Sequence, residues 1–579
     1  MHDTGTFMLG SLSPELIIKI LHHCQCSTIF RFAATCKTYH ELVAQTTSLQ
    51  LHIELEANGL ELVKGSFKEY ATYSVILDDL KRFRDAWLNL DFKEPIVRPV
   101  IKSEMLLWEL REGFYIVAFS QSGGSDADAL QFVPIDVEIP TPPPLLFDFT
   151  FSEFTADPGQ GLVATISGDP DSTHKCHVDL RSAVTGLAHP LAEYPRLTVE
   201  VDFESPPFSS GYSIEIMGHM VLVKVSHPRV HIYELLIWDW RSGILLQRIS
   251  SREGMCDFAF LDQRHLVVLS ATRSDLNRET LALLVYATPQ NASALHTSPG
   301  KQWRIVDFPF SRPILRLEFP RLKESSEITE RGFFLRSDPT PGRTIYAKSA
   351  AFACPYATTL SMTFCFHRTS ANWGVSPFYR VFVDGQSLLK HIYANSRDET
   401  QVIPWSVWGT DATRWFTAPE APDHWICWMS GSKYVRPLHD ISHYCVFDFS
   451  PLVAGRFQGR NVQSHPAALD VHSSGGPDIG DIGLLEYLDS CLLDFVADSP
   501  DHKPVIVTVG ADSPSTINTG KLDGVGFDEP IISRLPYRVV CKGNNEEDHE
   551  GWQINRDGII GVASWRPQSE TITIHKLNI

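Results

Sequence analysis

The residue pattern from position 101 onward constrains the fold more than any other feature of the sequence. Short apolar or alternating runs are separated there by Gly, Pro, Asp and Ser, which is the pattern of many β-strands joined by turns. Helical periodicity is scarce, and its clearest candidate is Leu484–Phe495. Residues 101–579 are therefore predicted to form a mainly-β domain. The expected strands include Phe114–Phe119, Met220–Val225, Tyr233–Trp240, Ile244–Ile249, Leu266–Leu269, Leu281–Tyr286, Tyr379–Val383, Tyr444–Phe449 and Val505–Val509.

An aspartate in or after several of these runs narrows the choice of architecture. Asp179, Asp239, Asp384 and Asp448 follow apolar residues and are followed within a few positions by Ser, Gly or Pro. These segments resemble degenerate WD-type repeats, in which a strand delivers an aspartate into a tight hairpin turn, although their spacing is irregular. We predict an α+β multidomain protein whose larger part is a β-propeller of six to eight blades. A pair of β-sandwiches is the alternative.

The first 45 residues have the pattern of short helices instead. Ser13 can cap a first helix, and Pro14 and Glu15 suit its first turn. Ser27 and Thr35 can cap a second and a third helix. The first helix then carries an apolar stripe made of Leu16, Ile17, Ile20, Leu21 and Cys24.

A unit of three such helices buries too little apolar surface to be stable by itself. Leu12, Pro14 and Ile18 lie off the main stripe of the first helix and are expected to stay exposed. Such a unit is expected to dock onto something else, either a second polypeptide or its own C-terminal domain. The pattern alone leaves both possibilities open.

A connector of residues 49–100 links the helical head, residues 1–48, to the β-rich domain. It contains one helical face, and Pro95 and Pro99 end the helical order after it. The residues of that face are Ile76, Leu77, Leu80, Phe83 and Trp87.

The charge balance limits the partners that the chain can have. Acidic residues outnumber basic ones 69 to 50, which gives a net charge of -19. Such a balance repels a phosphate backbone and an anionic membrane surface, so we expect no nucleic-acid or membrane partner. Neither a secretory signal nor an apolar run long enough to span a membrane is present. We expect an intracellular protein, of the cytoplasm and/or nucleus, with its 11 cysteines as free thiols.

Residues 12–21 (LSPELIIKIL) and 29–37 (IFRFAATCK) together resemble an F-box. That family begins with Leu-Pro, a nearby Glu and aliphatic residues, and continues with a Leu-rich segment and a Thr/Val-Cys/Ser-Lys/Arg stretch. Ser13 and Cys24 depart from the pattern, because the family prefers Pro and a larger aliphatic residue at these positions.

The resemblance implies a partner and a role for the head. A Skp-type adaptor would bind the helices and join the chain to a cullin scaffold and its RING subunit. The β-rich body would hold an unknown protein substrate, and the chain itself would need neither catalytic residues nor cofactors. The residues that match adaptor-binding positions are Leu12, Pro14, Leu16, Ile17, Ile20, Leu21, Ile29 and Phe32.

Short sequence segments in the mainly-β domain resemble segments of the large group of F-box proteins found in mushroom-forming fungi. They are residues 238–243 (WDWRSG), 534–538 (RLPYR), an acidic stretch at 544–550 and 557–561 (DGIIG). This resemblance implies the same combination of a helical head and a propeller-like body.

No motif in the sequence specifies catalysis or a metal. His22, His23, Cys24 and Cys26 are residue types that bind zinc, but a structural site needs a second pair of ligands at suitable spacing. No nucleophile elbow, Walker loop or dinucleotide fingerprint is present. We therefore expect neither a metal site nor an active site.

The densest unusual feature is a group of five tryptophans within residues 405–428, with Arg414 among them. Trp and Arg are common in binding hot spots, which makes Arg414 and Trp415 candidate substrate-binding residues. The alternative, which we favour for most of these rings, is that they pack the core of a blade.

Two other functions remain compatible with the sequence. In one, the head is an internal cap and the body is a propeller enzyme whose site is assembled from distant loops. In the other, the protein binds the adaptor but acts as a scaffold that targets nothing for degradation.

Overall fold

The structure is a computed structural model in which two compact units are distinguished, and each is described here by itself. The first comprises Met1–Phe92, Gly342–Tyr356 and Leu577–Ile579, and the second Lys93–Pro341 and Ala357–Lys576. The residues that the structure describes are 12–100, 105–136, 139–204, 211–273, 279–289, 303–305, 308–324, 326–330, 332–339, 341–342, 344–346, 348–368, 378–395, 399–418, 429–438, 443–457, 504–517, 526–543, 549–563 and 571–579. The predicted helix at 484–495 lies outside them.

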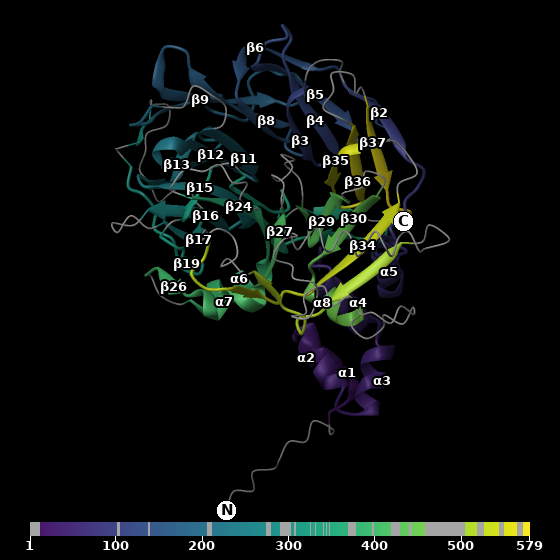
Figure 1. Ribbon diagram of the computed structural model, residues 1–579. Coiled ribbons are helices and arrows are strands. Elements are labelled where there is room, and N and C mark those ends of the chain that lie inside the picture. Colours follow the sequence, from purple (N-terminus) through teal and green to yellow (C-terminus); the bar gives the residue numbers. More distant parts are fainter. Residues whose placement is uncertain are drawn as a thin grey trace, which may run out of the picture. The chain divides into compact units, whose positions relative to one another are not determined.

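Five helices form most of the first unit (Figure 1). The three predicted helices are present, but Gln25 and Cys36 occupy the N-cap positions of the second and third instead of Ser27 and Thr35, and neither side chain makes a capping hydrogen bond. Ser13 precedes the first helix as predicted, although its hydroxyl makes no capping hydrogen bond. The helices are α1 (Pro14–Leu21), α2 (Cys26–Ala33), α3 (Lys37–Gln45), α4 (Thr47–Ala57) and α5 (Tyr73–Asn89).

A short sheet completes the core of this unit with residues from far along the chain. Strand β1 (Glu61–Leu62) pairs with β23 (Ala351–Ala353), which pairs with β22 (Thr344–Tyr346). The predicted boundaries at 48 and 100 therefore do not describe the folding unit, because α4 crosses the first and residues 342–356 join the helices. The core cluster contains Leu51, Leu60, Ile76, Leu77, Leu80, Ala350, Phe352 and Cys354.

The second unit is a seven-bladed β-propeller, within the predicted range of six to eight blades. Its sheets have four or five strands each in the part of the chain that the structure describes (Figure 1). Blade 1 consists of β3 (Met105–Arg111), β4 (Phe114–Phe119), β5 (Ala127–Pro134) and β6 (Leu145–Phe151). Blade 2 consists of β7 (Glu153–Asp157), β8 (Leu162–Asp169), β9 (Ser172–Ser182), β10 (Arg196–Glu200) and β18 (Trp303–Arg304). Blade 3 consists of β11 (Tyr212–Met217), β12 (Met220–His227), β13 (Ile232–Asp239) and β14 (Ile244–Ser251).

Blade 4 contains a strand that comes from within blade 5 in the chain, because the connection between two strands of blade 5 supplies the outermost strand of blade 4. That connection contains α6 (Gly385–Ala394), β26 (Gln401–Ile403) and α7 (Trp405–Ala412), and β26 pairs in parallel with β19. Blade 4 consists of β15 (Gly254–Asp262), β16 (His265–Arg273), β17 (Glu279–Ala287), β19 (Leu315–Glu318) and β26. Blade 5 consists of β20 (Ser326–Ile328), β21 (Phe334–Arg336), β24 (Thr359–Arg368), β25 (Phe378–Asp384) and β27 (Thr413–Ala418).

Strands from both ends of the domain close the ring. Strand β2 pairs with β37, with Ile96 opposite Ile574, so the propeller begins before the predicted boundary at 101. Closure of this kind leaves no exposed terminal sheet in a propeller. Blade 6 consists of β28 (Met429–Ser430), β29 (Lys433–Pro437), β30 (His443–Asp448), β34 (Tyr537–Gly543) and β31 (Val505–Val509). Blade 7 consists of β35 (His549–Ile554), β36 (Gly558–Ala563), β37 (Thr571–Lys576) and β2 (Ile96–Pro99). The shorter elements are η3 (Pro228–Val230), α8 (Pro451–Phe457), β32 (Ser515–Ile517) and β33 (Ile531–Ser533).

The hydrophobic core lies between neighbouring blades, where sheets pack face to face. One buried cluster joins blades 2 and 3 through residues such as Val178, Val223 and Trp238. Another joins blades 3 and 4 through residues such as Leu235, Phe258 and Leu284. Since residues on both faces of an inner strand are buried, its sequence is an apolar run without strict alternation.

The four aspartates selected from the sequence have different structural roles. Asp239 ends β13 in the predicted hairpin: its side chain accepts from the Arg241 N–H at 3.0 Å, and its carbonyl accepts from the Gly243 N–H at 2.8 Å. Gly243 has a φ of 66°, which glycine adopts without strain. The other three do not form hairpins: Asp179 lies within β9, Asp384 caps α6, and Asp448 precedes α8.

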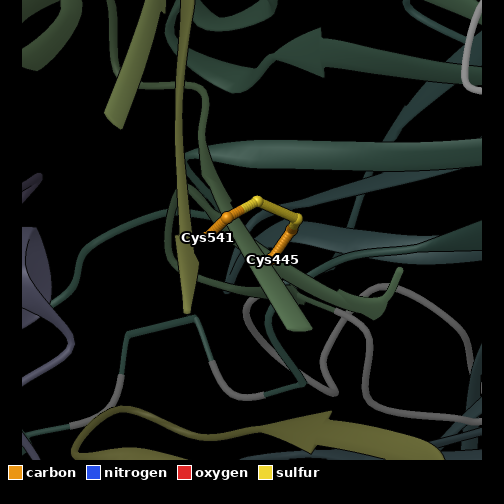
Figure 2. The surroundings of a disulfide bond; sticks show 2 residues. All are labelled: Cys445 and Cys541. Atoms are coloured by element: carbon orange, nitrogen blue, oxygen red, sulfur yellow. A yellow bond between two sulfur atoms is a disulfide. The ribbon is translucent and has the colours of Figure 1, made fainter. Parts of the chain in front are cut away.

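Two of the cysteines are bonded to each other, which corrects the expectation that all of them are free. Cys445 on β30 and Cys541 on β34 lie directly opposite in register, with their Cα atoms 4.4 Å apart (Figure 2). The pair is separated by 96 residues in sequence, so only strand pairing brings it together. Seven other cysteines among the described residues carry thiols.

No helix in the described part of the chain has the length and apolar composition needed to cross a membrane.

Candidate protein-binding site

An exposed apolar surface on α1 and α2 is the strongest candidate site. Leu16 and Ile20 are 51% and 49% exposed, and one helical turn separates them, so they lie on the same face of α1. Phe30 on α2 is 46% exposed. Exposed apolar side chains can mark contacts with other proteins, so these three residues, called the "head surface" (Leu16, Ile20 and Phe30), are suited to contact another protein.

The structure divides the eight predicted adaptor-binding residues into three groups. Ile17, Leu21 and Ile29 are buried and build the helical unit. Pro14, Leu16 and Ile20 are exposed, while Leu12 and Phe32 are partly buried. Phe32 stacks on Tyr39 with the ring centres 4.3 Å apart.

The structure adds two details of the head to the sequence prediction. The apolar stripe of the first helix is divided, because Ile17 and Leu21 are buried while Leu16 and Ile20 are exposed. Phe30 was not selected from the sequence, because its apolar character alone did not show that it lies on the exposed side of α2.

Hydrogen bonds to α4 hold the turn between α1 and α2. The Cys26 N–H donates to Glu56 Oε2 at 2.9 Å, and His52 Nε2 lies 3.0 Å from the Cys24 carbonyl. His22 Nε2 lies 3.0 Å from Ser48 Oγ. Burial, followed by the neighbouring His52 and His23 rings, lowers the pKa of His22, which favours its neutral form. These contacts fix the two helices that carry the head surface.

Arg414 and Trp415 lie in the interior of blade 5, which corrects their selection as substrate-binding residues. Both are fully buried. Arg414 donates from Nε to the Leu535 carbonyl at 2.7 Å and from Nη1 to the Ser513 carbonyl at 2.9 Å. Burial lowers its pKa to about 10, so it remains charged at neutral pH. Trp415 donates its indole N–H to Thr413 Oγ1 at 3.1 Å.

The neighbouring tryptophans also pack the fold. Trp408 is buried and donates its indole N–H to the Glu318 carbonyl at 2.9 Å, and Trp405 stacks on Phe319. Trp425 and Trp428 lie outside the described residues. The interpretation of this group as blade core holds for the rings that can be described.

A cluster of charged side chains on strands β3, β7, β11, β12, β15 and β21 of blades 1 to 5 was not predicted. Asp257 on β15 accepts from Lys224 Nζ at 3.3 Å and from Arg336 Nη1 at 2.6 Å. Burial by itself raises the pKa of Asp257, but these two cations outweigh it, so the pKa is lowered. Glu109 on β3 accepts from Thr155 Oγ1 and the Ala156 N–H, both at 2.9 Å.

Two glutamates of this "central cluster" (Glu109, Arg111, Glu153, Glu215, Lys224, Asp257 and Arg336) make no hydrogen bond with a described residue. Burial raises the pKa of Glu153 on β7 to about 8 and that of Glu215 on β11 to about 7. Both groups therefore change charge near neutral pH. The signal in the sequence was a carboxylate within an otherwise apolar strand, which by itself resembles a solvated position.

No group of three or more His, Cys, Asp or Glu side chains that could hold a metal ion occurs among the described residues. His22 and Cys24, which follow α1, make the hydrogen bonds described above and one from Cys24 Sγ to the Ile20 carbonyl.

Comparison with known proteins adds no family. No protein-family model matches the chain, and no curated protein matches it. Among solved structures, the chain is similar to the WD40 domain of SCAP from fission yeast, with 7% identity, a TM-score of 0.27, and coverage of 83% of this chain and 94% of that one. It is also similar to a member of the duf4221 family from Bacteroides vulgatus, with 8% identity, a TM-score of 0.23, and coverage of 51% and 83%. Both similarities are too low to support a function.

Proposed function

We propose that this protein is the substrate-recognition subunit of an SCF-type ubiquitin ligase. Its helical head would bind a Skp-type adaptor, which joins a cullin and a RING subunit, and its propeller would hold the protein to be ubiquitylated. The single observation that carries the proposal is the head surface of Leu16, Ile20 and Phe30, which is exposed on helices whose sequence resembles an F-box.

In this role the chain needs no catalytic residue of its own. Binding a target next to a separate ubiquitin-carrying enzyme raises the effective concentration of target lysines near the reactive thioester. A propeller suits this task, because its closed ring is a rigid frame for the loops between strands. The resemblance of the chain to the fungal F-box proteins, which implies a helical head and a propeller-like body, also supports the proposal.

The proposal implies a location in the cytoplasm and/or nucleus, where disulfides are uncommon. The Cys445–Cys541 bond is compatible with such a location because both residues are buried, at 1% and 0% exposure. A reductant would reach this bond only after the blade opens.

The test is co-purification with a Skp-type adaptor. We expect Leu16→Asp combined with Ile20→Asp to reduce the recovered adaptor at least tenfold, since each change places a charge at an apolar contact. The control carries Ser74→Asp and Asn89→Asp, two exposed positions on α5, and should bind like the wild type. Unchanged recovery with the double α1 variant, at unchanged helical circular dichroism, would refute the proposal.

A second experiment separates the ligase from a scaffold that binds the adaptor without targeting degradation. Partners that co-purify with the full chain are tested for ubiquitylation in the presence of adaptor, cullin and RING subunits. Ubiquitylation by the wild type, and its loss with the α1 variant, supports the ligase. Equal ubiquitylation with both proteins would contradict it.

A further inference from the structure

A pocket lies at the outer edge of blade 3, outside the head. Its volume is about 490 Å³. It lies beside β14 and the segment that runs past this strand. Its lining residues are Arg248, Ser250, Ser251, Arg252, Phe308, Pro309 and Phe310.

Beneath the pocket is a fixed network of charges. Glu234 is fully buried, and Arg248 holds both of its oxygens, from Nε to Oε2 and from Nη2 to Oε1, each at 2.9 Å. Arg248 Nη1 also donates to the carbonyls of Ile305 and Phe308, at 2.6 and 2.7 Å. This network makes the wall of the pocket rigid before any ligand arrives.

Arg252 is the polar group that is still available to a ligand. Its side chain is 42% exposed, and its Nη2 atom lies 2.5 Å from Asp202 Oδ2 and 3.3 Å from Glu234 Oε1. Its Nε and Nη1 atoms make no hydrogen bond with a described residue. A carboxylate can therefore bind this guanidinium without displacing Asp202, and charge-assisted bonds of this kind are among the stronger ones.

The edge of β14 supplies unpaired backbone groups beside Arg252. The Arg248 carbonyl accepts from the Ser311 N–H at 2.7 Å, so it points to the outer edge of the blade. Because the peptide groups of alternate residues point to the same side of a strand, Ser250 presents its N–H and C=O to this edge as well. No described residue pairs with them. An extended peptide can add to such an edge.

Apolar side chains form the remaining wall. Phe308 is buried and Phe310 is 66% exposed. An exposed ring next to a concave surface provides contact area for an apolar side chain, and Tyr, Trp and Phe are common at such contacts.

We propose that this pocket binds an extended peptide segment of a partner protein. The segment places an acidic side chain on Arg252, an adjacent apolar side chain against Phe308 and Phe310, and its backbone along the edge of β14 at Ser250. This inference rests on the target-binding half of the proposed function and names the chemistry of the recognised segment.

The experiment selects peptides and then measures their binding. A library of random eight-residue peptides displayed on phage is panned against the full-length protein, and enriched sequences are synthesised with a fluorescein label for anisotropy measurements. We expect sequences with Asp or Glu next to an aromatic or aliphatic residue. Arg252→Ala and Phe310→Ala should each weaken binding at least tenfold. The control is Arg241→Ala, an exposed arginine outside the pocket, which should bind like the wild type.

Three outcomes would overturn the inference. The first outcome is that panning enriches no peptide sequence, or that the enriched peptides bind the Arg252→Ala and Phe310→Ala variants as tightly as they bind the wild type. Another is unchanged affinity after N-methylation of the residues flanking the acid, since methylation removes backbone pairing. The third is binding of 3-phenylpropanoate alone as tightly as the peptide, which would indicate a small-molecule site.

The head variant separates this inference from the proposed function. Leu16→Asp with Ile20→Asp should bind the selected peptides like the wild type. Normal adaptor recovery together with failure of the peptide measurements would refute only the pocket assignment. Peptide binding without any adaptor recovery would refute only the ligase assignment.

Discussion

Replacing Glu153 by Gln should make the propeller more stable at neutral and alkaline pH. Glu153 begins β7 in the central cluster, where burial raises the pKa of its carboxyl from 4.5 to about 8. Lys224 and Arg336 oppose this rise, and Glu109 adds to it. Glutamine has nearly the same shape and cannot ionise, so the substitution removes the cost of the buried charge.

The sign and size follow from proton linkage. The folded-state pKa lies above the unfolded value, so the favourable contribution is complete below about pH 4.5 and is lost as pH rises through about 8. At ~1.4 kcal/mol per pKa unit, the deficit at pH 7 reaches about 3 kcal/mol without screening. Because the side chain retains some contact with water, we expect about 1–2 kcal/mol.

The assay is thermal unfolding of the full chain at pH 5 and pH 8. We expect Glu153→Gln and the wild type to melt alike at pH 5, and the variant to melt about 1–2 °C higher at pH 8. Glu193→Gln, an exposed position on the loop before β10, serves as control and should show no such pH-dependent difference. An equal difference at both pH values, or a less stable variant at pH 8, would refute the reasoning.

Three further predictions test other parts of the structure. Phe352→Ala, in the segment that completes the helical core, should cost about 3 kcal/mol and lower the hydrogen-exchange protection of α4 and α5; unaltered protection there would show that the helices do not need this segment. Arg414→Met should cost about 2–4 kcal/mol in denaturant unfolding, because it leaves the carbonyls of Leu535 and Ser513 without their donor, and a neutral result would contradict this. Cys445→Ser with Cys541→Ser should cost about 2–4 kcal/mol. In the wild type, mass spectrometry after alkylation should find neither residue labelled while the protein is folded in reductant, and rapid labelling would show that the bond is accessible.

Local signals in the sequence were sufficient to place most elements. Strands β4 and β31 have the predicted bounds, and the hairpin at Asp239 was recognised because its residues Asp, Ser and Gly suit only a tight turn. Four of the five residues predicted for the face of α5 are buried, namely Ile76, Leu77, Leu80 and Trp87. These features depend on residues close together in the chain, so periodicity and turn chemistry determine them.

Part of the candidate site could also be predicted. The motif of residues 12–37 selected the helices, and within them Leu16 and Ile20 are exposed. It could not separate these two from Ile17 and Leu21, because all four are aliphatic residues on a helix of eight residues. Only the neighbouring helices determine which side is covered.

The remaining features required the tertiary structure, and each depends on segments far apart in the chain. Residues 342–356 join the helical core, β2 closes the ring with β37, and Cys445 meets Cys541 across 96 residues. Asp384 has the same kind of sequence neighbourhood as Asp239, yet it caps a helix because the chain continues toward blade 4. The sequence alone therefore determined many of the strands, the short helices of the head and the apolar character of the head. Burial, pairing and charge environment were decided by long-range packing, whose free energy is absent from any local stretch of residues.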